Sequence, residues 1–194
     1  MSTPLAELWV FDFDGTLVET AALKRAAFFD VFPERHAGVV LAALERSPDA
    51  SRHDIIPEIV AATGDPALDA ATIIHSYTRQ VRERVMAASA TPGAEDALRW
   101  AARQGVACIF SMTPEAELVL QLQSRGWDVW LSGIRGYPAR KPDTLAEWII
   151  QFGADRVTVI GDGISDAEAA MQNRARFFRA DSGWPARVMQ ATAS

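Results

Sequence analysis

The sequence has few of the residues that cross-link a chain or attract large charged partners. Its one cysteine, Cys108, excludes a disulfide within the chain, and a small buried hydrophobe is its expected role. The 19 basic residues are outnumbered by 25 acidic ones, which gives a net charge of −6. This balance disfavours nucleic acid and anionic membrane surfaces as partners, because both require a basic patch.

Long apolar runs and a targeting signal are also missing. No run approaches the length that spans a bilayer, and no basic region precedes an apolar core at the N-terminus, so we expect a cytoplasmic protein. The three histidines, His36, His53 and His75, lack the clustering of metal ligands. With 194 residues, 49% of them hydrophobic, the chain is long enough to bury one core with a smaller added unit.

The most informative stretch present is 8–16, where an apolar run ends in two aspartates, a glycine and a threonine. The run predicts a strand buried on both faces. Alternate residues of a strand point the same way, so Asp12 and Asp14 leave it on one side, and Gly15 permits a tight turn. Two neighbouring carboxylates are costly unless a cation or a shared proton relieves them, which suits chemistry, although Asp-Gly is also a common turn.

Between residues 18 and 90 the sequence predicts helices and no strand. Thr20 is expected to cap the first helix, and apolar residues recur at helical spacing most clearly in the last. The predicted helices cover residues 20–32, 34–46, 54–62 and 67–88. A connection of this length must pack as a unit of its own, and Thr91-Pro92-Gly93 is expected to form a hinge at its end.

From residue 94 onward, predicted helices and strands alternate. Strands are expected at 106–110, 128–131, 156–160 and 175–178. Helices are expected at 94–104, 142–152 and 185–190. Two further helices are expected, one that begins at Pro114 with Thr113 as its cap, and one that begins with a capping box of Ser165 and Glu168. Such alternation predicts an α/β fold, a doubly wound (Rossmann-like) parallel sheet. The core would comprise residues 1–17 and 91–194, with 18–90 as an inserted helical domain.

Polar residues follow the predicted strands at their carboxyl ends, where ligands bind in sheets of this kind. They are Asp12, Asp14, Ser111, Lys141, Asp162 and Asp166. Each has an ordinary alternative explanation as a turn residue or a solvated lysine. Their joint occurrence at strand ends, in this order, favours a site.

This set resembles the phosphatase branch of the haloacid dehalogenase superfamily over nearly the whole chain. The stretch Asp12-Phe13-Asp14-Gly15-Thr16 matches the first family motif, Ser111 the second, Lys141-Pro142 the third, and Gly161-Asp162 with Asp166 the fourth. The helical insertion resembles a C1-type cap, as in phosphoglycolate-phosphatase-like and beta-phosphoglucomutase-like members. Met112 follows Ser111, where many relatives carry asparagine.

The resemblance implies a Mg²⁺-dependent hydrolase of small phosphorylated metabolites that forms an aspartyl-phosphate. Asp12 would be the nucleophile, Asp14 the general acid and base, and Lys141 a fixed positive charge. The transferring phosphate would be bound by Ser111, Met112 and Lys141. The metal would be held by Asp12, the Asp14 carbonyl and Asp162, and supported by Asp166 and Thr16.

Several alternatives remain open from the sequence. A phosphomutase uses the same residues, and a catalytically idle binding or regulatory protein would keep the fold. A dehalogenase is disfavoured because haloacid cleavage does not need Asp14 and Asp162, and the long insertion argues against a signalling receiver domain. Lys24 and Arg52 are the candidate cap residues for substrate recognition, Arg52 in a turn-rich segment from which it could reach outward. The oligomeric state is not fixed.

Overall fold

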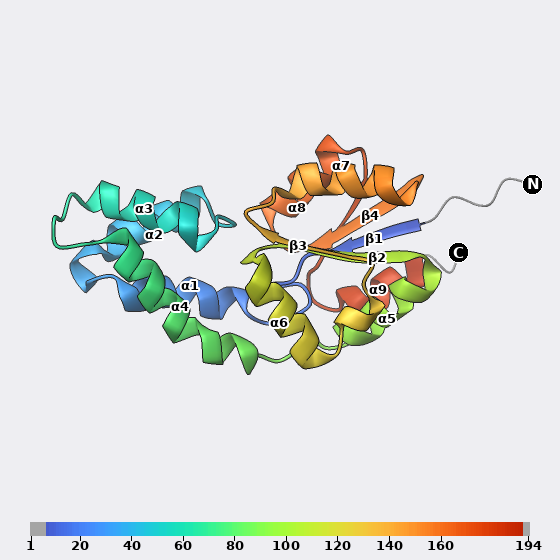
Figure 1. Cartoon of the computed structure of the whole chain (residues 1–194), viewed down its shortest axis with the longest axis horizontal. Helices are drawn as coiled ribbons and strands as arrows, with labels where there is room; N and C mark the ends of the chain where they lie inside the picture. The colour runs from blue at the N-terminus through green and yellow to red at the C-terminus, as the bar shows by residue number, and fades with distance from the viewer. Residues whose placement is uncertain (1–6, 192–194) are drawn as a thin grey trace, which may run out of the picture. The chain divides into compact units, whose positions relative to one another are not determined.

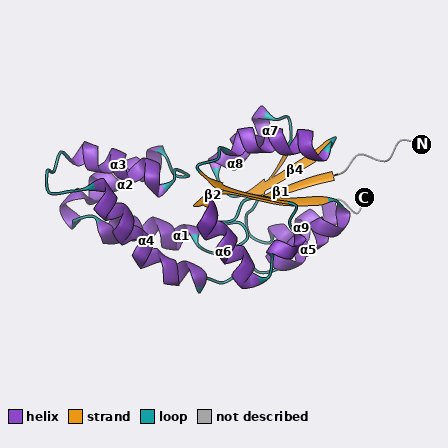
Figure 2. Cartoon of the chain, in the orientation of Figure 1, coloured by secondary structure: helices purple, strands orange, loops and turns teal. Residues whose placement is uncertain are grey.

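The computed structural model describes residues 7–191 and divides them between two compact units. One unit comprises the chain up to Glu19 together with the part from Ser89 onward, and the other is Thr20–Ala88. The first contains every strand of the described chain, and the second is helical (Figures 1 and 2). The predicted α/β class is confirmed by a five-stranded, all-parallel sheet in the order β3-β2-β1-β4-β5.

The sheet unit alternates strands and helices along the chain. Its elements are β1 Glu7–Phe11, α5 Ala94–Gln104, β2 Val106–Pro114, α6 Glu115–Arg125, the 3₁₀ turn η2 Asp128–Trp130, β3 Gly133–Tyr137, α7 Lys141–Phe152, β4 Arg156–Gly161, α8 Ile164–Gln172, β5 Arg176–Arg179 and α9 Trp184–Ala191. In Figure 1, α7 and α8 cover one face of the sheet, and α5, α6 and α9 cover the other.

The central strand β1 is buried on both faces, as its apolar run predicts. Leu8 and Val10 belong to a cluster with Leu145 and Trp148 of α7. Trp9 packs edge-on against Trp100 of α5, with ring centroids 4.9 Å apart. The alternation of side chains along a strand therefore supplies an apolar surface to both helical layers. Asp12, the next residue, accordingly emerges at the carboxyl end of the middle strand.

Three predicted features of the sheet unit need correction. The stretch predicted as a strand at 128–131 contains the 3₁₀ turn η2, and the strand is β3, which begins at Gly133. The sequence of β3 lacks the apolar pattern of a strand, because glycines occupy positions 133 and 136. At both positions the neighbouring residues pack too closely for a larger side chain. A Cβ atom at Gly136 would lie 2.5 Å from the Thr113 carbonyl oxygen, and one at Gly133 would lie 2.9 Å from the Trp148 ring.

The other two corrections concern helix starts. Strand β2 continues through Ser111 and Thr113 to Pro114, so α6 begins at Glu115 and Thr113 is not its cap. Helix α8 begins after Gly163, whose backbone N–H donates to Asp166 at 3.0 Å, rather than after a box of Ser165 and Glu168. The two residues predicted as caps thus have other places: Thr113 lies within strand β2, and Ser165 lies within helix α8.

The helical unit consists of α1 Ala21–Val31, the 3₁₀ turn η1 Glu34–His36, α2 Ala37–Arg46, α3 Arg52–Thr63 and α4 Ala70–Met86. These lie close to the predicted ranges. The helices share an apolar core that includes Phe28, Ile56 and Tyr77. No described helix combines the length and the hydropathy needed to cross a membrane.

The two connections at the base of the insertion lie side by side. Thr91 donates its N–H to the Leu17 carbonyl, and Glu19 donates its N–H to the Ser89 carbonyl, both at 3.0 Å. Val18 and Ala90 form an antiparallel bridge between these bonds. The insertion is thus joined to the sheet unit through one short antiparallel pair rather than through two separate loops.

Candidate active site

The end of β1 is shaped by a tight loop. The Asp12 N–H donates to the Ile160 carbonyl at 2.8 Å, which extends the pairing with β4, and the Gly15 N–H donates to the Val18 carbonyl at 2.8 Å. Gly15 has φ of +81°, and a Cβ atom there would lie 2.3 Å from the Asp162 carboxylate. Glycine is required both by this dihedral angle and by the close approach of that carboxylate.

Lys141 lies between two carboxylates at the start of α7. Its Nζ donates to Asp12 Oδ1 at 2.8 Å and to Asp166 Oδ1 at 2.7 Å, and all three side chains are buried. Burial by itself lowers the pKa of Lys141, but the two neighbouring carboxylates outweigh it and raise that pKa above its usual value. The site therefore holds a permanent positive charge beside Asp12.

Asp12, Asp162 and Asp166 each place a carboxylate oxygen within 4.8 Å of the other two. Burial raises the pKa of Asp12 well above its usual value, against Lys141, and the charges of Asp166 and Asp14 raise it further. Burial likewise raises the pKa of Asp162, although the Thr16 hydroxyl donates to its Oδ1 at 3.1 Å. Crowded carboxylate oxygens that are costly to ionise fit a hard divalent cation, which would relieve the repulsion.

The Asp14 carboxylate is held from another strand. Its Oδ2 accepts hydrogen bonds from the Thr113 hydroxyl at 2.6 Å and from the Ser111 hydroxyl at 3.2 Å. The sequence interpretation placed Thr113 at a helix cap and so missed this contact. The available signal was its spacing, because residues two apart on a strand point the same way and Thr113 follows Ser111 by two.

The structure thus brings together Asp12, Lys141 and Asp166 in one group, Asp162 and Thr16 in a second, and Asp14 with Ser111 in a third. Met112 lies between Ser111 and Thr113 and is partly buried. A thioether has no proton to donate, so any contribution of Met112 to phosphate binding would come from its backbone N–H.

The two predicted recognition residues lie in the helical unit. Arg52 was expected in a loop between helices, but it is the first residue of helix α3. It is 9% exposed, and its guanidinium lies 5.9 Å from the centre of the Tyr77 ring. Lys24, in α1, is partly buried, and its carbonyl accepts a hydrogen bond from the Tyr77 hydroxyl at 3.1 Å. Both residues therefore contact the same tyrosine inside this unit.

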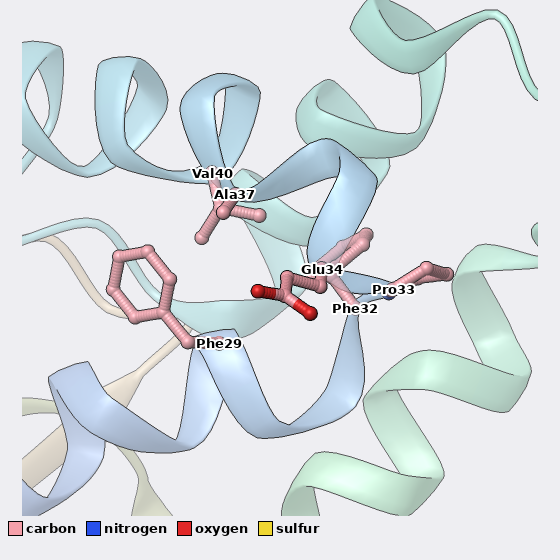
Figure 3. A pocket seen from close by; sticks show the side chains of 6 residues that line it. All are labelled: Phe29, Phe32, Pro33, Glu34, Ala37 and Val40. Carbon is pink, nitrogen blue, oxygen red and sulfur yellow. The ribbon is translucent and has the colours of Figure 1, made fainter.

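The helical unit also contains a pocket of about 340 Å³ that includes neither residue (Figure 3). It lies where α1 ends and α2 begins, and it is lined by Phe29, Phe32, Pro33, Glu34, Ala37 and Val40. Its single charged lining residue is a carboxylate, which would repel a phosphate group. The pocket is therefore not the place where Lys24 and Arg52 would bind a phosphorylated ligand.

The sequence as a whole matches a known family. The model of the haloacid dehalogenase-like hydrolases matches residues 7–172. The chain belongs to this family. The predicted family membership is therefore confirmed, and so is the prediction that the protein is a hydrolase. No curated protein sequence matches the chain.

Several solved structures share the fold of this chain. CbbY from Rhodobacter sphaeroides, in complex with phosphate, has a TM-score of 0.70 and 19% identity over 93% of this chain and 88% of that one. A Thermotoga maritima protein provisionally named beta-phosphoglucomutase has a TM-score of 0.63 and 17% identity over 95% and 91%. A Lactobacillus plantarum protein provisionally named phosphoglycolate phosphatase has a TM-score of 0.67 and 16% identity over 96% and 99%. At these identities the likeness concerns the fold.

Proposed function

We propose that the protein is a Mg²⁺-dependent hydrolase that cleaves the phosphate monoester of a small metabolite through an aspartyl-phosphate. The observation that carries this proposal is the ion pair between Asp12, at the end of the central strand, and the buried Lys141, beside the carboxylates of Asp162 and Asp166. The lysine and a bound divalent cation would keep Asp12 ionised against the burial that raises its pKa, as a nucleophile requires. Asp14 accepts hydrogen bonds from the Ser111 and Thr113 hydroxyls, which hold a carboxyl group in place to give and take a proton.

Asp12 is the proposed nucleophile. Among the described residues, only Lys141 is hydrogen-bonded to its carboxylate, through Oδ1, so Oδ2 remains for attack on phosphorus. A bond forms from Asp12 to phosphorus as the bond to the leaving oxygen breaks, and Asp14 gives that oxygen a proton. Water then attacks the aspartyl-phosphate, Asp14 takes the proton from the water, and Asp12 is restored with release of inorganic phosphate.

The anionic substrate must be held against an acid-rich site. Two like unit charges at 4 Å repel by about 4 kcal/mol at an effective dielectric constant of 20. Lys141 offsets part of this repulsion, and the Ser111 hydroxyl with the backbone N–H near Met112 would bind the transferring oxygens. Asp166 accepts from Lys141 through Oδ1 and from the Gly163 N–H through Oδ2, so it would hold the lysine in position.

Mg²⁺ would be held by Asp12, the Asp14 carbonyl and Asp162, with Thr16 orienting Asp162 through its hydroxyl. When bound, it would supply positive charge that offsets the negative charge of the phosphate oxygens. We further propose that residues 18–90 act as a cap, with Lys24 and Arg52 recognising a polar or anionic leaving group. The core would then comprise 1–17 and 91–194.

A phosphomutase is the second candidate. Its support is the fold shared with the protein provisionally named beta-phosphoglucomutase. It would return the phosphate from Asp12 to a substrate hydroxyl instead of to water. Prompt release of inorganic phosphate without a bisphosphate activator would exclude it, and no phosphate transfer of either kind would favour a binding protein without activity.

The test is to incubate the purified protein with a panel of phosphorylated metabolites and MgCl₂, and to measure inorganic phosphate. We expect turnover with at least one small monoester, and none with the Asp12→Asn variant. Absence of turnover across the panel, including with generic aryl phosphates, would contradict the proposal.

A further inference from the structure

The hydroxyl groups around Asp14 do not have equal roles. Thr113 donates to Asp14 Oδ2 at 2.6 Å, and Ser111 donates to the same oxygen at the longer distance of 3.2 Å. Thr113 also donates its backbone N–H to the Ser111 oxygen at 3.0 Å. Both hydroxyl-bearing residues are buried, with exposures of 5% for Thr113 and 2% for Ser111. Thr113 therefore holds the Asp14 carboxylate through its hydroxyl, and it holds Ser111 through its backbone N–H.

The proton count separates the two residues further. A hydroxyl group has a single proton to donate. If Ser111 binds a transferring phosphate oxygen, as the proposed function requires, it can no longer donate to Asp14. Of these two hydroxyl donors, Thr113 would still hold Oδ2 during phosphoryl transfer. A carboxylate that loses one hydroxyl donor keeps its orientation better when another donor is close and buried, as Thr113 is.

We propose that Thr113 is a positioning residue for Asp14, which fixes Oδ2 and so aims the carboxyl group at the leaving oxygen while Ser111 binds phosphate. The proposal rests on the proposed function, because it assigns Asp14 to proton transfer. It predicts a defect confined to substrates whose leaving group needs a proton. Alkyl phosphates need one, whereas nitrophenyl phosphate departs with little help because its leaving group is a weak base.

The experiment compares kcat/KM for an alkyl phosphate and for nitrophenyl phosphate. Thr113→Val removes the hydroxyl and keeps the branched shape, and Thr113→Ser keeps the hydroxyl. Thr158→Val is the matched control, since Thr158 is also buried in a strand, at 4% exposure in β4. Because kcat/KM reports only the steps up to departure of the leaving group, slow hydrolysis of the aspartyl-phosphate does not disturb it.

We expect Thr113→Val to lower kcat/KM about tenfold or more for the alkyl phosphate and less than about threefold for nitrophenyl phosphate. Thr113→Ser should restore most of the loss, Thr158→Val should show none, and Asp14→Asn should show the same substrate dependence with a larger loss. Equal losses on both substrates, or failure of serine to rescue, would overturn the role of Thr113 while leaving the hydrolase intact. An inactive wild-type protein would overturn the proposed function, and the role of Thr113 with it.

Discussion

Charge is distributed differently in the two units of the chain. In the sheet unit, Asp12 and Lys141 are each 5% exposed and Asp166 is fully buried, so an ion-pair network lies inside the protein. In the helical unit, ion pairs lie at the surface, as between Arg46 and Glu58, whose side chains are 60% and 43% exposed, or close to it, as between His36 and Asp65, at 12% and 14%. Burying charge is costly, and isolated surface pairs contribute little. The sheet unit therefore accepts a cost that packing does not require, which is typical of a site for chemistry.

Arg52 is buried more deeply than these ion pairs of the helical unit. It is 9% exposed, and its guanidinium lies over the Tyr77 ring, 5.9 Å from the ring centre. A cation over the face of an aromatic ring is attracted to it, which favours one position of the guanidinium. In burial, Arg52 is therefore closer to Lys141 of the sheet unit than to the surface pair of Arg46 and Glu58.

The most severe test of the comparison is to neutralise the central carboxylate. Asp12→Asn should lower turnover by at least about 10³-fold, because an amide cannot attack phosphorus, and it should prevent trapping of a phospho-enzyme analogue with beryllium fluoride. The matched control is Asp155→Asn, the same change at an exposed position, which should have no effect. Near-normal turnover in Asp12→Asn would show that another group is the nucleophile.

Metal removal should have the next largest effect. Excess chelator should abolish hydrolysis of an aryl phosphate, MgCl₂ should restore it, and CaCl₂ should not, because the looser calcium shell would misplace the nucleophile. Full activity in chelator would contradict the proposed cofactor.

The same ion should act on stability. Burial raises the pKa values of Asp12 and Asp162, so their protonated forms favour folding at low pH, and this contribution is lost as the pH rises through the raised pKa values. At neutral pH, bound Mg²⁺ should offset the loss. At a free Mg²⁺ concentration of 100 times its Kd, the free energy of unfolding should rise by about 2.7 kcal/mol, and Tm should rise with it. The increment should shrink on acidification, and a Tm that ignores Mg²⁺ at every pH would oppose binding at this cluster.

Removing the buried lysine should destabilise the fold. Lys141→Met leaves Asp12 and Asp166 without their cation, and breaking a buried pair from one side costs about 3–5 kcal/mol. The control is Lys24→Met, at the only other lysine of the chain, which is partly exposed and should change the free energy of unfolding far less. Denaturant unfolding at neutral pH measures both, and equal changes would mean that Lys141 is not stabilised by its two carboxylates.

The smallest effects are expected in the helical unit. If Lys24 and Arg52 recognise the leaving group as proposed, Lys24→Ala and Arg52→Ala should each lower kcat/KM on the true substrate by roughly tenfold while sparing a generic aryl phosphate, because each variant would lack one charged contact. Since Arg52 packs on Tyr77, its variant needs a stability measurement as a control. Equal losses on both substrates, or none, would assign recognition to other residues.

Much of the grouping of residues at the candidate site could be predicted because these residues follow short, local patterns. Asp12, Asp14 and Gly15 follow one apolar run, and Ser111 and Asp162 each follow another, so the rule that parallel strands end at one edge suffices to group them. Thr113 was missed because proline and a helix follow it, which is also typical of a cap. The prediction misplaced strand β3 because the strand has no hydrophobic pattern. Its glycines are required by the close approach of Thr113 and Trp148, which the sequence does not show.

By itself, the sequence determined the alternation of strands and helices, the helical insertion and the carboxylates at the strand ends, because periodicity and turn residues act over a few neighbours. Only the tertiary structure decided which side chains meet: Lys141 with Asp166, Thr16 with Asp162, and Thr113 with Asp14 across 99 positions of the chain. These bonds depend on strand register, on the length of β2 and on how closely two backbones approach. No local pattern specifies such quantities, since each is set by both partners at once.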